Sequence, residues 1–202
     1  MPTVVVPFAG PDGKTRLQLS ASARRDLSHA MLGDVLAACV GVAPTRVVTP
    51  DRDVVALLRE AGAEAVADPG GGQGAAVEAA LATVVSGPVL VVNADLPCVG
   101  SHDLWSLLAA TGEGGLAMVQ AADGTTNALG LYEPTAFAQL YGPGSAARFR
   151  EHAAGLGLEA VSLVIPNLAD DVDSLHDLRR LEHRCGPRTR ACLAELAEGA
   201  RS

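Results

Sequence analysis

The sequence predicts an α/β protein with a mostly parallel central sheet flanked by helices. Two observations support this fold class. Short continuous apolar runs, which are typical of strands buried on both faces, alternate along the chain with longer segments of helical pattern. The connections between them are short, as they are in right-handed βαβ units. With 202 residues and 49% hydrophobic content, the chain can bury a sizeable core, and we expect one domain over residues 1–202.

The first half of the chain shows the clearest alternation. It begins with the apolar run TVVVPF and ends with the run VLVV at 89–92. Asp68 and Pro69 end a strand in between, and an alanine-rich helix follows. The elements we expect here, in order, are a strand at 3–8, a helix at 20–40, a strand at 46–50, a helix at 52–61, a strand at 64–68, a helix at 73–85 and a strand at 89–93.

The second half is less regular but continues the alternation of strands and helices. It contains no internal repeat, linker or low-complexity segment. The elements we expect are a short helix near 102–110, strands near 115–121 and 128–132, helices near 134–140 and 146–154, a strand near 160–165, and helices at 174–184 and 187–198.

Composition argues against several classes of function. The net charge of −8 disfavours nucleic acid as a partner, because binding to phosphate backbones requires a basic face. No apolar run reaches the roughly 18 residues that span a bilayer, and the N-terminus lacks the pattern of a signal peptide. We therefore expect a cytoplasmic protein without a membrane partner. The four cysteines include no C-x-x-C pair, so we expect reduced thiols.

Ligands of open α/β sheets bind beyond the carboxyl ends of the strands, so the loops there are candidates for a site. The loop at 7–17 contains Gly10, Gly13, Lys14 and Arg16. Glycines let backbone N–H groups approach a phosphate, and the two cations can neutralise it. Lys14 is the only lysine among the 15 Lys and Arg residues. An ordinary surface turn with two solvated cations explains the same loop.

A second loop, at 67–76, carries three consecutive glycines between Asp68 and a helix. Gly70, Gly71 and Gly72 are entropically costly in a row, which indicates close approach of a ligand or of another backbone to the helix N-terminus. A merely flexible loop is the alternative.

A carboxylate at the end of a buried strand marks the third loop. Asp95 follows the apolar run at 89–92, and Pro97 ends the strand and fixes the turn. A carboxylate in this position can ligate Mg²⁺ through oxygen. Capping of the helix that begins near Ser101 is the other role that a carboxylate could have here.

The turn at 141–148 reads YGPGSAAR and is a candidate anion site. Gly142 and Gly144 make the turn tight, and Ser145 is placed to cap the following helix. The N–H groups of that helix, with Arg148, could meet an anion. A turn followed by an N-cap explains Ser145 without any ligand.

Three acidic residues crowd the segment before the next helix. Ser174 and Asp177 fit a capping box, but capping does not account for Asp170, Asp171 and Asp173. A second metal carboxylate within this group is therefore a hypothesis that the sequence supports.

Taken in order, these segments resemble the 2-phospho-L-lactate or phosphoenolpyruvate guanylyltransferases of deazaflavin coenzyme F-420 biosynthesis, and the resemblance spans nearly the whole chain. It rests on K-x-R-L at 14–17, D-P-G-G-G at 68–72, A-D-L-P at 94–97, T-N-A-L at 126–129, Y-G-P-G-S-A-A-R at 141–148 and D-V-D at 171–173. It implies the GT-A nucleotidyltransferase fold, and transfer of GMP from GTP to a small phosphorylated acid with Mg²⁺ and release of pyrophosphate.

The resemblance also implies roles for individual residues. Lys14, Arg16 and Asp95 would be catalytic, with Asp95 and one of the two residues Asp171 and Asp173 holding Mg²⁺. The nucleotide would contact Gly10, Gly13, Lys14, Asp68, Gly70, Gly71 and Gly72. The phospho-acid would contact Thr126, Asn127, Gly142, Ser145 and Arg148.

Three other functions compete with this one. A molybdenum-cofactor-type nucleotidyltransferase shares the fold, but that hypothesis leaves the turn at 141–148 unexplained. The D-x-D at 171–173 is typical of glycosyltransferases, which usually carry it at mid-chain. A non-catalytic nucleotide-binding partner is favoured by two departures: relatives often carry Lys where this chain has Phe8, and Leu-Asn where it has Gln73-Gly74.

The acceptor and the oligomeric state are not determined by any residue we can name. Phosphoenolpyruvate, 2-phospholactate and 3-phosphoglycerate are all compatible with the motifs. The arginine-rich, alanine-rich composition resembles that of G+C-rich actinobacterial proteins, which favours phosphoenolpyruvate by analogy.

Overall fold

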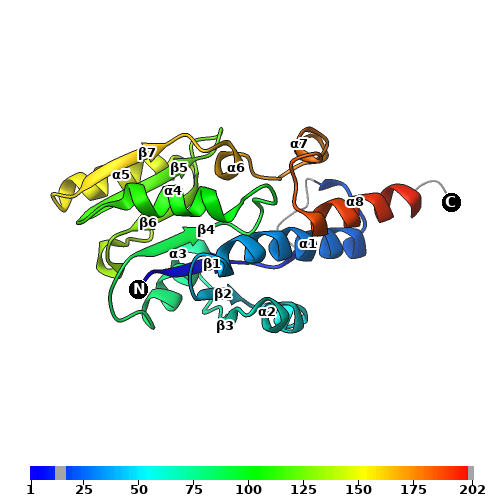
Figure 1. The fold of residues 1–202 in the computed structure, drawn as a ribbon, viewed down its shortest axis with the longest axis horizontal. Coiled ribbons are helices and arrows are strands. Elements are labelled where there is room, and N and C mark those ends of the chain that lie inside the picture. Colours follow the sequence, from blue (N-terminus) through cyan, green and yellow to red (C-terminus); the bar gives the residue numbers. More distant parts are fainter. Residues whose placement is uncertain (12–16, 200–202) are drawn as a thin grey trace.

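The computed structural model describes residues 1–11 and 17–199 (Figure 1). The first half of the chain forms the elements β1 (Thr3–Pro7), α1 (Ala21–Val40), β2 (Thr45–Thr49), the 3₁₀ helix η3 (Arg52–Val54), α2 (Val55–Ala61), β3 (Glu64–Ala67), α3 (Gln73–Leu81) and β4 (Val89–Val92). The second half forms α4 (Ser101–Thr111), β5 (Gly115–Gln120), β6 (Thr126–Leu131), the 3₁₀ helix η4 (Pro134–Ala136), α5 (Ser145–Gly155), β7 (Glu159–Leu163), α6 (Pro166–Ala169), α7 (Leu175–Leu181) and α8 (Pro187–Gly199).

The seven strands form a sheet in the order β3-β2-β1-β4-β6-β5-β7. Strand β6 runs antiparallel to its neighbours β4 and β5, and the other pairings are parallel. In the centre, Val5 of β1 lies beside Arg46 of β2 and Val91 of β4. The expected α/β class and mostly parallel sheet are therefore confirmed.

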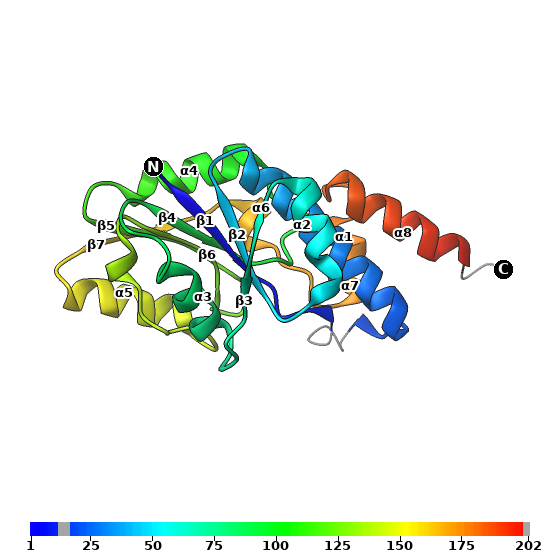
Figure 2. The same cartoon turned by 90° about the horizontal axis from the view of Figure 1, so that it is seen from below.

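Helices cover both faces of the sheet, as Figure 2 shows. Alternate strand residues point to opposite faces. Val4 and Val6 pack into a core with α1, α2 and α4, whereas Val5 packs on the other face with α3 and α5. A third apolar cluster joins the first half of α1 to α7 at one end of the molecule. Burial on both faces explains why the central strands are apolar at nearly every position.

Several expected helices differ from those observed: the one at 174–184 ends at Leu181, and the one at 52–61 begins as the 3₁₀ turn η3. The helix expected at 73–85 ends at Leu81, because the β-branched residues Thr83, Val84 and Val85 that follow are poor helix formers. The helix expected at 134–140 was wrong beyond the short turn η4. The backbone of Phe137 is extended and ends the turn, and the Phe137 ring packs 6.4 Å, centre to centre, from that of Phe149.

Candidate active site

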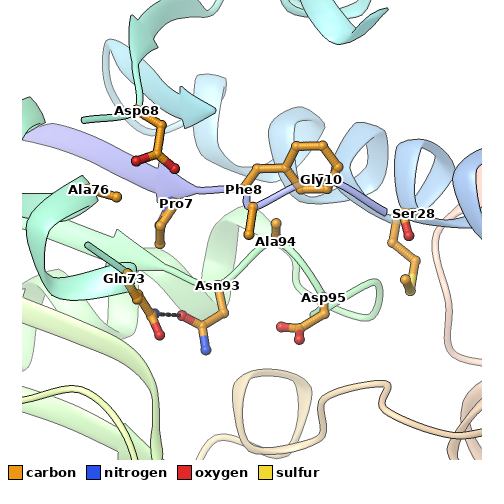
Figure 3. A pocket seen from close by; sticks show the side chains of 13 residues that line it. Pro7, Phe8, Gly10, Ser28, Asp68, Gln73, Ala76, Asn93, Ala94 and Asp95 are labelled. Atoms are coloured by element: carbon orange, nitrogen blue, oxygen red, sulfur yellow. Dashed lines mark hydrogen bonds between the residues drawn. The ribbon is translucent and has the colours of Figure 1, made fainter. Parts of the chain in front are cut away.

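Strands β1 to β4 run parallel, so their carboxyl ends lie at one edge of the sheet. The loops that leave this edge surround a cavity of about 250 Å³, shown in Figure 3. Asp68, Gln73 and Ala76 lie at one end of the cavity, and Asp95 and Ser28 lie at the other. Its lining consists of Pro7, Phe8, Ala9, Gly10, Ser28, Met31, Asp68, Gly72, Gln73, Ala76, Asn93, Ala94 and Asp95.

Three aspartates from distant parts of the sequence meet beside this cavity. Asp95, Asp171 and Asp173 each offer one carboxylate oxygen, and these oxygens lie within 4.8 Å of one another. A backbone contact fixes their approach, because the N–H of Val172 donates to the carbonyl of Asp95 at 3.1 Å. The structure therefore brings together the three residues that the resemblance assigned to a metal.

The electrostatics of Asp171 are those of a crowded carboxylate. Burial raises its pKa, and the negative charge of Asp95 raises it further. A hydrogen bond from the side chain of Asn127 acts in the opposite direction but does not cancel these effects. The charged form of this aspartate is therefore disfavoured in the protein alone.

These observations fit a divalent cation at the three aspartates. Hard cations such as Mg²⁺ prefer oxygen ligands, and a nearby cation would reverse the mutual repulsion of the carboxylates. Asp95, Asp171 and Asp173 are all half-buried, so their side chains can reach both a cation and a ligand in the cavity.

Asp170 has a different role from the two acids that follow it. Its carboxylate accepts hydrogen bonds from Arg180 at 2.7 Å and from Arg184 at 2.8 Å. Burial alone would raise the pKa of Asp170, but these two hydrogen bonds outweigh it and lower the pKa below its ordinary value. Asp170 thus joins this segment to α7 and the turn after it, and is not part of the cluster that Asp171 and Asp173 form with Asp95.

Asn127 on β6 connects the sheet to the acidic cluster. Its side-chain nitrogen lies 3.2 Å from the carbonyl oxygen of Ala169 and 3.4 Å from Oδ1 of Asp171. The residue is 2% exposed. Asn127 therefore contacts a candidate metal ligand, besides being a predicted contact of the phospho-acid.

Thr126 and Ser145 contact each other. The hydroxyl of Ser145 donates to Oγ1 of Thr126 at 3.0 Å, and both residues are fully buried. Gly144 is the N-cap of α5, and no side-chain capping bond is made there, so the capping role expected for Ser145 was wrong. The left-handed backbone of Gly144, with φ of 70°, begins the helix one residue earlier.

Arg148 holds the turn that precedes its own helix. Its guanidinium donates to the carbonyl oxygens of Leu140, Tyr141 and Pro143. Gly142, inside this turn, lines a second cavity of about 330 Å³ together with Gly71, Gly72, Gln73, Gly74, Gln139 and Tyr141. Arg148 therefore shapes the wall of this cavity.

The glycine-rich loop contributes to the walls of both cavities, because Gly72 lines each of them. Gly70, Gly71 and Gly72 all have φ between 77° and 89°, a region that favours glycine and explains why three follow one another. Asp68 accepts the N–H of Gly70 at 2.7 Å and so fixes the start of the loop. Gly72 ends the loop as the N-cap of α3, with no side-chain capping bond.

Two polar residues at the site were not among the predicted contacts. The amide nitrogen of Gln73 donates to Oδ1 of Asn93 at 2.7 Å, as drawn in Figure 3. Asn93 directly follows the buried strand β4, and that position was the signal that could have identified it. The departure at Phe8 is also explained, since this side chain is 6% exposed and its ring lies edge-on to that of His29.

Three predicted contacts lie outside the described residues. Gly13, Lys14 and Arg16 fall within 12–16, so their predicted roles stay predictions. In the part of the chain that is described, no helix has the length and apolar character needed to cross a membrane.

Comparison with known proteins gives a consistent result. Residues 2–196 match the family described as "Guanylyl transferase CofC like". A phosphoenolpyruvate guanylyltransferase from Streptomyces coelicolor is 38% identical over an alignment 208 residues long, gaps included, which covers 96% of each chain. One from Nocardia farcinica is 34% identical over 203 residues, covering 93% of this chain and 88% of the relative.

Solved structures agree on the fold. A nucleotidyl transferase from Methanothermobacter thermautotroptrophicus superposes with a TM-score of 0.67 at 18% identity, covering 91% of this chain and 97% of the other. The glucosyl-3-phosphoglycerate synthase of Mycobacterium tuberculosis, solved with Mn²⁺, UDP-glucose and phosphoglyceric acid, gives 0.57 at 14% identity, with 80% and 69% covered. At these identities the likeness concerns the fold alone.

Proposed function

The chain belongs to the CofC-like guanylyl transferase family, and from this premise we propose that it transfers GMP from GTP to the phosphate of phosphoenolpyruvate, with release of pyrophosphate. The acceptor is supported by the names of the curated relatives, which match at 32–38% identity over most of the chain. The observation that carries the chemistry is the meeting of Asp95, Asp171 and Asp173 beside the first cavity, which Asp95 lines. The product would serve coenzyme F-420 biosynthesis.

The reaction requires positioning and positive charge more than acid–base catalysis. A phosphate oxygen of the acceptor attacks the α-phosphorus of GTP in line with departing pyrophosphate. The phosphate of phosphoenolpyruvate is already anionic near neutral pH, so no side chain has to remove a proton from it. Negative charge builds on both sides of the α-phosphorus during this displacement.

The acidic cluster is the place for Mg²⁺ in this proposal. Asp95, Asp171 and Asp173 would hold the ion, which when bound neutralises the charge that builds on the phosphates. Asn127 keeps Asp171 in place through its hydrogen bond to Oδ1. A nucleotide-binding partner without activity would not need three carboxylates at this spacing, so the cluster supports an enzyme.

The nucleotide and the acid would occupy the two cavities. The nucleotide would occupy the first one, where Gly10, Asp68 and Gly72 are lining residues and where the α-phosphate would lie near Asp95. Lys14 and Arg16, which follow Gly10 in the sequence, would add positive charge.

Phosphoenolpyruvate would occupy the second cavity, which the glycine-rich loop also lines and where Gly142 is a lining residue. The buried pair of Thr126 and Ser145 would support the turn that carries Gly142.

Pyrophosphate release by the purified chain tests this function. The assay pairs GTP, ATP or CTP with phosphoenolpyruvate, 2-phospholactate or 3-phosphoglycerate in the presence of Mg²⁺. We expect release with GTP and phosphoenolpyruvate, and none when the Asp95→Asn variant replaces the native chain. Release with GTP and 2-phospholactate alone would correct the acceptor, and silence in every pairing would refute the function.

A further inference from the structure

A chain of side-chain hydrogen bonds runs from the acidic cluster to the glycine-rich loop. It begins at Asp171, passes through Asn127 on β6 and Asn93 after β4, and ends at Gln73, the first residue of α3. These residues come from four separate parts of the sequence. This series of hydrogen bonds joins the end of the first cavity where Asp95 lies to the end where Gln73 and Asp68 lie (Figure 3).

Backbone carbonyls fix the direction of this chain at its first step. The side-chain amide of Asn127 lies 3.2 Å from the carbonyl oxygen of Ala169, which can only accept a hydrogen bond. The atom of Asn127 that faces Ala169 must therefore be the nitrogen. Its oxygen is then the atom that faces Asn93, at 3.4 Å.

The second step is fixed in the same way. The side-chain amide of Asn93 lies 3.4 Å from the carbonyl oxygen of Thr126, and its nitrogen must again be the atom that faces this acceptor. The oxygen of Asn93 is thus left to face Gln73, so Gln73 must present its nitrogen there, at 2.7 Å. With one N–H of Gln73 donated to Asn93, its second N–H and its side-chain oxygen remain for a ligand, and the oxygen is the acceptor of the two.

The position of Gln73 places this oxygen at the nucleoside end of the site. In the proposed function, the α-phosphate lies at Asp95, so the ribose and base extend toward the opposite end of the cavity. Pro7, Phe8 and Ala76 provide apolar surface along this path, which suits the faces of a planar base. This end of the cavity thus offers a base both apolar contacts and a hydrogen-bond acceptor of fixed orientation.

We propose that Gln73 is a specificity-determining residue, whose side-chain oxygen accepts a hydrogen bond from the exocyclic 2-amino group of guanine. This inference rests on the proposed function and names the part of GTP that the site selects. Asn93 and Asn127 are positioning residues, because they act on the base through Gln73. A glutamine without these partners could rotate its amide and offer a donor as easily as an acceptor, and would discriminate less.

Comparison of GTP with ITP tests the proposal, because inosine lacks only the 2-amino group of guanosine. Binding is measured by titration calorimetry with Mg²⁺ and without acceptor acid, so that no turnover occurs. We expect the native chain to bind GTP about three- to tenfold more tightly than ITP, which is the effect of one hydrogen bond. In Gln73→Leu, this ratio is expected to fall to about one through weaker binding of GTP, with ITP affinity nearly unchanged.

The controls separate this inference from a general loss of structure. Gln120→Leu makes the same chemical change at an exposed glutamine at the end of β5, and should keep the native ratio. Thermal unfolding checks that each variant is folded. Equal affinity of the native chain for GTP and ITP would overturn the inference, and this result needs no variant.

The two proposals can fail separately. If the native chain releases pyrophosphate from GTP and phosphoenolpyruvate but binds GTP and ITP equally, the assignment of Gln73 is wrong and the function stands. If Gln73→Leu retains the native preference for GTP, the assignment is also wrong. Failure of the native chain to bind either nucleotide would overturn both proposals.

Discussion

Buried and half-buried aspartates in this molecule fall into two groups: those that accept hydrogen bonds at a helix N-terminus, such as Asp34, and those that lie close to one another. Asp34, on α1, is 5% exposed and accepts the backbone N–H groups of Arg188 at 3.0 Å and Thr189 at 2.8 Å. It thereby binds the N-terminus of α8, where the helix dipole favours a negative charge. Asp95, Asp171 and Asp173 instead face one another.

The difference shows how a carboxylate serves stability in one place and function in another. Around Asp34, hydrogen-bond donors compensate for the loss of water. At the acidic cluster, burial and the charge of Asp95 raise the pKa of Asp171, and an added cation would offset both effects. Substitution of the first group should therefore affect folding, and substitution of the second should affect catalysis.

The largest expected effect is the loss of turnover on substitution of Asp95. Asp95→Asn keeps the shape of the side chain but removes a charge that would hold Mg²⁺, so kcat should fall at least about a hundredfold. The free energy of unfolding should change little. Both quantities are measured by pyrophosphate release and by urea denaturation.

Asp53→Asn is the matched control for that variant. Asp53 is exposed and forms a surface ion pair with Arg25 at 3.5 Å. It is not part of the acidic cluster. Native turnover in Asp95→Asn would show that the cluster does not hold a catalytic metal.

Substitution of Asp34 should have the opposite profile. Asp34→Ala leaves two N–H groups of α8 without their acceptor in a buried place, and should lower the free energy of unfolding by about 2 kcal/mol. The KM and kcat of the variant should stay near native values below its unfolding temperature. A loss of activity without a loss of stability would break the distinction between the two groups.

Asp103 gives a smaller effect of the same kind. Its carboxylate accepts the N–H of Gly100 at 2.8 Å and the side-chain amide of Asn167 at 3.0 Å, and so stabilises the start of α4. Asp103→Ala should lower the free energy of unfolding by about 1 kcal/mol. Thermal unfolding at fixed pH is sufficient to measure this, and an unchanged melting temperature would contradict the role.

The smallest expected effect is a slight gain in stability, on substitution of Asp171. Because the pKa of Asp171 is raised, the native state binds its proton more tightly than the unfolded chain does. Stability should therefore fall as the pH rises from the ordinary aspartate pKa through the raised pKa of Asp171. Without divalent ions, Asp171→Asn should remove part of this decline and be slightly more stable than the native chain at neutral pH.

Added Mg²⁺ should reverse that order, because the ion would stabilise the native cluster more than the variant. Unfolding curves across pH, with Mg²⁺ and with a chelator, measure both effects. A stability of Asp171→Asn below that of the native chain in the chelator would contradict the repulsion inferred for the cluster.

The sequence predicted those parts of the molecule in which local pattern determines structure. The apolar run before Asp95 predicted a buried strand with a carboxylate at its end, and both are observed. The capping box of Ser174 and Asp177 was confirmed at the start of α7. In these places the relevant contacts lie within a few residues of one another.

The rest depends on contacts between distant segments. The segment near Phe137 was predicted to be helical, but beyond the turn η4 it is irregular, and its aromatic side chains pack against Phe149 of α5. Asp170 and Asp171 have different roles because Arg180 and Arg184 bind Asp170 rather than Asp171. The two arginines reach Asp170 only after α7 and the turn that follows it have formed.

The bond between Gln73 and Asn93 likewise joins two loops that only the sheet brings together. No local pattern in the sequence contains this information.

The nature of the reaction product tests the central claim most directly. Native chain, GTP, phosphoenolpyruvate and Mg²⁺ are incubated, and the product is examined by ³¹P NMR and mass spectrometry, with Asp95→Asn in parallel. The account predicts a diphosphate in which the phosphorus of phosphoenolpyruvate is coupled to that of GMP, formed together with pyrophosphate and absent from the variant. GMP or GDP with unchanged phosphoenolpyruvate, or equal product from Asp95→Asn, would contradict it.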